Sequence, residues 1–270
     1  MSDAQDTKLS HEASGGIQSL DAALRVLQHL ATLPGAVGVS ELARACDMPV
    51  SKVHRYLASF VHAGLVQQNG RSGTYDLGLA AQSLGLSALA RRDIVNTVSD
   101  ELVELTRETG CTTLLSVWAD LGPTVVRWQR APAPVITSFG LGTTFPLLSS
   151  ATGRAFFAHS PPELVSPLIA REKRRAKQNP LLIEDLPSAH TMDERIDILR
   201  QKTREAQVAI VDGRFIPGLR ACAAPILNWQ GEADVVVTAI GTDPALSDPR
   251  SETAQKVLEF SRRLSSEQQS

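Results

Sequence analysis

The sequence has few aromatic residues, few cysteines and little net charge, and each shortage excludes a class of protein. Aromatic residues make up only 4% of the 270 residues, so alanine, leucine and valine must supply most of the core. Cys46, Cys111 and Cys222 lie far apart, without CxxC or CxxH spacing, which argues against a disulfide framework or a zinc site. A formal net charge of −2 argues against a non-specific polyanion binder but permits a local basic surface for DNA.

Long apolar runs are also missing. No run reaches the ~18 residues that would span a bilayer. Residues 1–16 are polar and contain no apolar segment of a signal peptide. We therefore expect a cytoplasmic protein with no membrane partner. The hydrophobic fraction of 43% and the charged fraction of 21% are typical of a chain that forms a globular core.

Motifs of catalysis are absent from the sequence. It contains no GxSxG, HExxH or Walker A pattern. Gly140–Phe145 lacks the third glycine of a dinucleotide fingerprint, and His159 and His190 are isolated. These absences predict a protein that is not an enzyme and that uses no cofactor and no metal.

The first third of the chain predicts three short helices and a hairpin after a disordered tail at residues 1–16. Apolar residues recur at helical spacing from Leu20 to Leu30, and further helical segments follow at residues 41–46 and 50–63. Turn residues at Asn69-Gly70 and Ser72-Gly73 favour a hairpin over residues 65–78. The helix boundaries are expected at the cap and breaker residues Ser19, Pro34-Gly35, Ser40, Pro49 and Gly64.

The third of these helices has two different faces. One side is expected to carry the apolar residues Val50, Val53, Leu57, Phe60 and Val61, which would pack on the first two helices. Polar residues that can bind phosphate or base edges gather in its N-terminal half, at the start of the second helix and in the hairpin. The predicted DNA-binding residues are Ser40, Ser51, Lys52, His54, Arg55 and, at the hairpin tip, Arg71. A generic three-helix bundle with a solvated face would show the same pattern.

The rest of the chain alternates strands and helices, which predicts an α+β domain. A helix at residues 79–90 is followed by an amphipathic helix at 95–109. The strands are expected at residues 112–118, 124–128, 135–139, 221–227 and 234–240, and further helices at 151–159, 192–206 and 251–264.

Several motifs in both halves resemble those of the IclR-type transcriptional regulators of bacteria. In the first half they are Gln18-Ser19-Leu20-Asp21-x-Ala23-Leu24, Ser40-Glu41-Leu42-Ala43, Pro49-x-Ser51-x-Val53-His54-Arg55-x-Leu57 and Gly73-x-Tyr75-x-Leu77-Gly78. In the second half they are Pro146-Leu147, Ala151-Thr152-Gly153-Arg154-Ala155 and Gly218-Leu219-Arg220-x-Cys222-Ala223-Ala224-Pro225.

The resemblance implies a winged helix-turn-helix domain at residues 17–79, a linker helix at 80–94 and a GAF-like effector domain at 95–265. The effector domain would have a curved antiparallel sheet with helices on one side and a ligand cavity on the other. The implied function is a regulator that binds operator DNA and responds to a small molecule. This chain departs from the family pattern at Arg154, where lysine is usual, at Val211–Arg214, where an acidic cluster is frequent, and at Ile240, where serine is common. The resemblance therefore does not indicate which effector this chain binds.

The expected effector site begins at the start of the helix at 151–159. Small residues precede this helix, and free N–H groups at a helix N-terminus attract anions. We expect a small organic acid, with its carboxylate on the amides around Ala151, Thr152 and Gly153; simple capping by Ser150 or Thr152 is the alternative. The candidate effector residues are Ser150, Ala151, Thr152, Gly153, Asp212, Arg220, Cys222 and Thr238. Arg220 would bind a ligand carboxylate or pair with Asp212. Cys222 lies in an apolar strand, where a cysteine is more often a core residue than a reactive one.

Three further expectations concern partners. Paired half-sites favour a symmetric dimer or a dimer of dimers, with the helices at 20–30 and 79–90 as contacts.

Five basic residues lie within Arg171–Lys177, where a solvated helix or loop face is favoured over a nucleic-acid contact. A GAF-type signalling module, whose helix-turn-helix serves only for docking, is the competing function.

Overall fold

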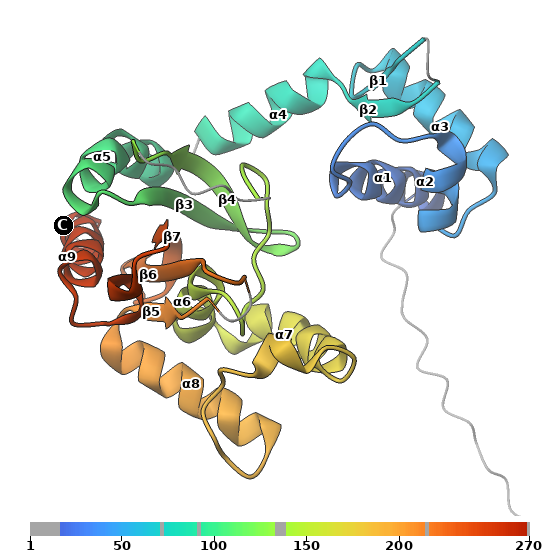
Figure 1. Ribbon diagram of the computed structural model, residues 1–270. Helices are drawn as coiled ribbons and strands as arrows, with labels where there is room; N and C mark the ends of the chain where they lie inside the picture. Colours follow the sequence, from blue (N-terminus) through green and yellow to red (C-terminus); the bar gives the residue numbers. More distant parts are fainter. Residues whose placement is uncertain (1–16, 71–72, 91–92, 133–138, 214–215, 269–270) are drawn as a thin grey trace, which may run out of the picture. The chain divides into compact units, whose positions relative to one another are not determined.

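The chain divides into two compact units, residues 1–91 and 92–270. A computed structural model describes residues 17–70, 73–90, 93–132, 139–213 and 216–268. The predicted tail at 1–16 lies outside these ranges, as do Arg71 and most of the strand expected at 135–139. Figure 1 shows the elements of each unit.

The first unit is three helices, a hairpin and a fourth helix. Its core joins residues of all three helices to the hairpin, with Val26, Leu42, Val53, Leu57 and Tyr75 buried at its centre. The elements are α1 (Gln18–Ala31), α2 (Val39–Ala45), α3 (Val50–His62), β1 (Val66–Gln68), β2 (Tyr75–Leu77) and α4 (Leu79–Ala90).

The helix starts of this unit differ by a residue or two from the predicted caps. Ile17 and Gly38 occupy the N-cap positions of α1 and α2, without side-chain capping bonds. Ser19 and Ser40 therefore lie in the first turns of these helices rather than before them. Pro49 is the N-cap of α3, not its first helical residue. Serine and proline are frequent at neighbouring positions of a helix start, so composition alone does not fix the boundary.

The buried face of α3 is narrower than predicted. Val53, Leu57 and Phe60 are buried as expected, but Val50 is 46% exposed and Val61 is 38% exposed. Half-buried Tyr56 also packs against the core. The buried stripe is therefore turned toward Tyr56, and the two outer valines lie at its edge.

A two-stranded antiparallel hairpin follows α3. The N–H of Asn69 donates to Thr74 O at 2.9 Å, and that of Gly73 donates to Asn69 O at 2.8 Å, which closes the turn. Gly73 has a φ of 66°, a conformation that suits glycine in turns. Val37 adds a β-bridge to Tyr75. This hairpin is the expected wing.

The second unit is built on a five-stranded sheet with the order β4-β3-β7-β6-β5, in which every neighbouring pair is antiparallel. The elements are α5 (Asp93–Thr109), β3 (Thr112–Ala119), β4 (Gly122–Gln129), α6 (Ala151–His159), α7 (Pro162–Ala176), η1 (Pro180–Ile183), α8 (Met192–Ala206), β5 (Ala209–Val211), β6 (Arg220–Leu227), β7 (Ala233–Gly241), η2 (Pro244–Ser247) and α9 (Glu252–Glu267).

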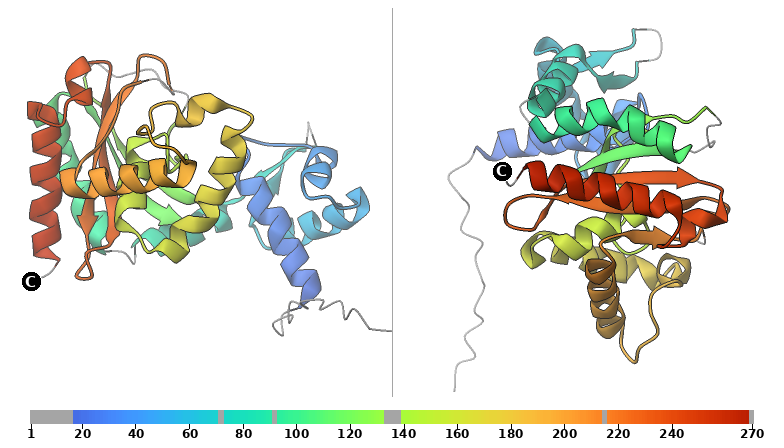
Figure 2. Two further views of the ribbon diagram at one scale, coloured as in Figure 1. Left: turned by 90° about the horizontal axis from the view of Figure 1, so that it is seen from below. Right: turned by 90° about the vertical axis from the view of Figure 1, so that its left-hand side faces the viewer.

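Helices cover both faces of this sheet. α5 and α9 pack side by side on one face and bury the larger core (Figure 2). On the other face α6 packs against β6 and β7 around Phe156. The resemblance implied helices on one side of the sheet and a cavity on the other, and the cavity side carries α6 as well.

Other differences concern short elements. β4 begins at Gly122, so the turn after β3 is tighter than the predicted turn at residues 120–123. α7 and the three-residue strand β5 were not predicted. Within the described ranges, no helix is both long and apolar enough to cross a membrane.

Candidate functional site

The first candidate site is the outward face of α3. Ser51, Lys52, His54 and Arg55 are all exposed, while Val53 between them is buried. The ammonium of Lys52 lies 5.9 Å from the ring centroid of Tyr56. No ion pair of Lys52 or Arg55 is found among the described residues, so both cations are available to phosphate or base edges. Ser40 is exposed in the first turn of α2, which packs against α3.

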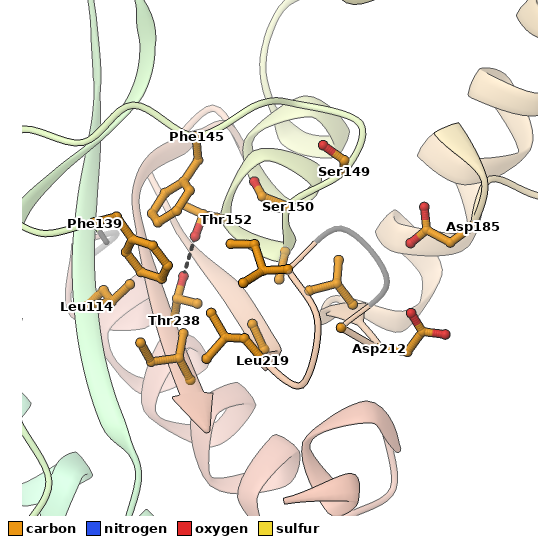
Figure 3. A pocket seen from close by; sticks show the side chains of 16 residues that line it. Leu114, Phe139, Phe145, Ser149, Ser150, Thr152, Asp185, Asp212, Leu219 and Thr238 are labelled. Atoms are coloured by element: carbon orange, nitrogen blue, oxygen red, sulfur yellow. Dashed lines mark hydrogen bonds between the residues drawn. The ribbon is translucent and has the colours of Figure 1, made fainter. Parts of the chain in front are cut away.

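The second candidate site is a cavity of about 50 Å³ between the sheet and the start of α6 (Figure 3). Its walls come from β3, β6 and β7, from α6, and from the segments before α6 and after β5. The lining residues are Leu114, Phe139, Phe145, Ser149, Ser150, Ala151, Thr152, Asp185, Val211, Asp212, Gly213, Ile216, Leu219, Ala221, Thr238 and Ile240.

The first two residues of α6, Ala151 and Thr152, line this cavity. Ser150 caps the helix: its Oγ accepts the N–H of Gly153 at 2.9 Å and donates to Pro146 O at 2.6 Å. The Oγ1 atoms of Thr152 and Thr238 lie 2.8 Å apart. Within the described residues the N–H groups of Ala151 and Thr152 have no hydrogen-bond partner, as expected for the first turn of a helix. Capping by Ser150 therefore coexists with two free amides.

Gly153 is a packing residue rather than a ligand residue. A Cβ there would lie 1.9 Å from Pro146 O and 2.7 Å from Leu147 Cα. Its amide is occupied by Ser150, and the residue does not line the cavity. Gly153 is therefore not an effector contact. A residue without a Cβ is required there because the backbone of Pro146 and Leu147 passes close to it.

Arg154, next along α6, is buried with all its nitrogens in use. Nε donates to Leu148 O and Nη1 to Ile210 O, each at 2.8 Å. Nη2 lies 2.5 Å from Oδ2 of Asp185. The guanidinium thus ties the loop before α6, β5 and the segment after η1 together, and it neutralises the Asp185 carboxylate at the edge of the cavity.

Two protein-family descriptions match the chain. "IclR helix-turn-helix domain" matches residues 19–70, and "Bacterial transcriptional regulator IclR C-terminal" matches residues 86–266. The chain belongs to the IclR family of bacterial transcriptional regulators. The predicted family resemblance and α+β fold class are thereby confirmed. As a member of the IclR family it is a ligand-responsive transcriptional regulator with a helix-turn-helix DNA-binding domain.

Individual relatives are similar to this chain over nearly its whole length. The HTH-type transcriptional regulator BhcR of Paracoccus denitrificans (strain Pd 1222) is 28% identical over 258 residues, which cover 95% of this chain and 89% of that protein. The crystal structure of Pseudomonas aeruginosa HmgR is 29% identical, with a TM-score of 0.70, covering 93% of this chain and 99% of that one. An IclR homologue from Microbacterium hydrocarbonoxydans, solved in complex with 4-hydroxybenzoate, is 19% identical and shares the fold with a TM-score of 0.69, covering 93% and 98%.

In this IclR regulator, Arg220 and Cys222 lie away from the cavity. Successive residues of a strand point to opposite faces, and Ala221 and Ala223 of β6 belong to the cavity-side core. Cys222 lies in the core under α5 and α9, where burial raises the pKa of its thiol to about 12. Arg220 Nη1 donates to Thr242 O at 3.2 Å. Neither residue lines the cavity, and the continuous apolar run of β6 gave no signal of which face each would take.

The other candidates do line the cavity. Ser150, Ala151, Thr152, Asp212 and Thr238 meet there from three separate parts of the sequence. Thr238 is brought to the site by its register, since it pairs with Leu114 of β3 and with Ala223 of β6.

A polar group and an aromatic wall of the cavity were not predicted from the sequence. Ser149 is 3% exposed, and its Oγ has no hydrogen-bond partner within the described residues. Phe139 and Phe145 pack edge to face with centroids 5.3 Å apart, and Trp128 packs on Phe139 at 5.5 Å. Trp118 packs instead on Phe156. The position of Ser149 beside Ser150 was the one available signal for this residue.

The described residues contain no cluster of three or more His, Cys, Asp or Glu side chains that could hold a metal ion. The basic run at Arg171–Lys177 covers the C-terminal end of α7 and its C-cap, and Arg174 and Arg175 are exposed there.

Proposed function

We propose that this regulator is controlled by a small organic acid bound in the cavity at the start of α6. The observation that carries the proposal is the Oγ of Ser149, which is buried without a partner beside the free amides of Ala151 and Thr152. A buried polar group without a partner costs on the order of 1–3 kcal/mol. A carboxylate that accepts from Ser149 and the two amides removes this cost and adds charge-assisted hydrogen bonds.

The rest of the cavity favours an apolar ligand body. Phe139, Phe145, Leu114 and Leu219 surround the space next to the Thr152–Thr238 pair (Figure 3). Phenyl rings in an edge-to-face arrangement offer an aromatic ligand the geometry that aromatic pairs prefer. The 4-hydroxybenzoate bound by the Microbacterium hydrocarbonoxydans homologue is an acid of this kind and supports the same class of ligand here.

On DNA, we assign the contacts to Ser40, Ser51, Lys52, His54 and Arg55, with Arg71 proposed as the wing residue. The exposure of the first five supports this assignment. Ligand binding changes DNA affinity only if the two conformations of the effector domain bind the ligand unequally. The helix α4 joins the two units in sequence and is the proposed lever.

The same helix is proposed as a contact in a symmetric dimer or dimer of dimers. Leu79, Leu84 and Leu86 are exposed on α4, which contains no charged residue. Such a surface on a regulator favours association with a second copy. We further propose that the protein acts in the cytoplasm, where operator DNA lies, and has no catalytic activity.

The effector site is tested with Ser149→Ala in the full-length protein. Calorimetry with 4-hydroxybenzoate and a panel of simple carboxylic acids identifies a ligand of the wild type. Loss of one hydrogen bond to a charged group costs about 1.5–3 kcal/mol, so Ser149→Ala should bind that ligand roughly 10- to 100-fold more weakly. Ser166→Ala, an exposed serine on α7, is the control and should bind as the wild type does.

A bulky substitution in the cavity tests whether ligand binding there controls the response to effector. Thr152→Trp fills the cavity and should abolish the response to effector while specific DNA binding in gel-shift assays is kept. Unaltered ligand affinity in both Thr152→Trp and Ser149→Ala would place the effector site elsewhere. DNA binding that is not specific for the operator would favour the signalling module in which the helix-turn-helix only docks.

A further inference from the structure

A groove of about 420 Å³ adjoins the effector cavity. Phe139, Phe145, Ser149 and Ile216 line both spaces. The buried Ser149 hydroxyl therefore lies at the boundary between them. A ligand bound at this hydroxyl has the groove as its continuation.

Two guanidinium groups line the groove away from the cavity. Arg171 and Arg175 lie one turn apart on α7, and positions i and i+4 share one face of a helix. Within the described residues neither makes an ion pair. Both are exposed, so they can reorient toward an anion.

The one acidic side chain among the described lining residues of the groove is already engaged. The carboxylate oxygens of Glu172 accept the N–H groups of Leu147 and Leu148 at 2.6 and 2.9 Å. Burial raises the pKa of Glu172, which the two hydrogen bonds and the neighbouring arginines partly oppose. Two arginine cations and one carboxylate therefore line the groove, and this balance of charge favours an anionic ligand.

We propose that the effector is an elongated acid with two anionic groups, one held at the start of α6 and the other by Arg171 and Arg175 in the groove. The apolar stretch between them passes Phe139, Phe145 and Ile216. This inference rests on the proposed function of the cavity. It gives two members of the basic run at Arg171–Lys177 a role in ligand selection, separate from any contact with nucleic acid.

The test compares acids of equal length with one or two carboxylates. Calorimetry on the full-length protein uses the series butanoate to octanoate against succinate to suberate, together with 4-methylbenzoate against terephthalate. The wild type should bind a diacid of suitable length about tenfold more tightly than its monoacid, as expected for one additional pair of charge-assisted contacts. Because the guanidinium groups are exposed, this preference should shrink as salt is raised.

The double variant Arg171→Gln/Arg175→Gln should lose the preference for the diacid and keep the affinity for the monoacid. The matched control is Arg174→Gln, an exposed arginine of the same helix that does not line the groove, and it should keep the preference. Equal binding of diacids and monoacids by the wild type, or a preference that survives in the double variant, overturns the two-anion proposal and leaves the cavity proposal intact. A wild type that binds no acid in either series contradicts both.

Discussion

Gly153→Ala is expected to destabilise the effector domain, although alanine is the better helix former. Gly153 lies in the first turn of α6, and the loop before this helix crosses over it. An added Cβ would lie 1.9 Å from Pro146 O, whereas real Cβ atoms essentially never approach another atom within 3.0 Å. The atoms in the way belong to the backbone, so no flexible side chain can move aside.

The magnitude follows from two opposing effects. Replacing glycine by alanine inside a helix gains up to about 1 kcal/mol, and less in the first turn. Overpacking costs about 1–3 kcal/mol, and the upper part of this range applies where backbone must shift. The expected net loss is about 2 kcal/mol, which corresponds to a Tm lowered by roughly 4–8 °C for a domain of this size.

Tryptophan fluorescence is the suitable assay. All three tryptophans, Trp118, Trp128 and Trp229, belong to the second unit. Their emission during urea or thermal unfolding therefore reports on the effector domain without a contribution from the DNA-binding unit.

Gly85→Ala is the matched control. Gly85 lies inside α4, and nothing lies within 4 Å of the position that its Cβ would take. This substitution should be neutral or stabilising by up to about 1 kcal/mol, measured by far-ultraviolet circular dichroism. Gly153→Ala with a free energy of unfolding equal to that of the wild type would refute the claim that the loop needs a glycine at this crossing.

Three further predictions concern DNA, assembly and pH. Arg55→Ala should reduce discrimination between operator and scrambled DNA by about 1–3 kcal/mol at fixed salt, and unchanged discrimination would remove this arginine from base reading. Leu84→Gln/Leu86→Gln should lower the mass measured by light scattering at micromolar concentration, and a wild type that is monomeric with and without DNA would contradict a dimer. Burial, with a contribution from the nearby Arg204, lowers the pKa of His159 from 6.5 to about 4, so the unfolded chain binds the proton first as pH falls. The stability that this neutral histidine contributes is complete above pH 6.5 and is lost toward pH 4, by up to about 3 kcal/mol. Urea unfolding should show this loss in the wild type and not in His159→Gln.

Elements with a strong terminal signal were predicted well. The bounds of α6 and α8 match the expected residues 151–159 and 192–206 because Ser150 and Thr191 are true N-caps. For α2 the cap residue is Gly38, which has no side chain to signal the boundary, and Ser40 was taken for the cap instead. β5 has only three residues, too few for a periodic pattern.

The cavity was harder to predict than the helix that opens it. Both faces of β6 are buried, so its apolar run carries no alternation that would separate Ala221 from Cys222. The contact between Thr152 and Thr238 spans 86 residues and depends on strand register. Gly153 and Arg154 belong to a recognisable family motif, but their roles follow only from the packing around them. Arg154 connects the surrounding loops, and Gly153 leaves space for the backbone of Pro146 and Leu147.

The strict alternation along β6 and β7 has a consequence for how such regulators diversify. Ala221, Thr238 and Ile240 face the ligand cavity, whereas Cys222 and Ala239 face the core under α5 and α9. Residues of the proposed effector site and residues of the core under α5 and α9 therefore alternate along the same strands. Substitutions at Thr238 and Ile240 should therefore change ligand preference at the proposed effector site, while Cys222 and Ala239 keep the core under α5 and α9. Libraries randomised only at the cavity-facing positions should accordingly yield many folded proteins with altered ligand preference.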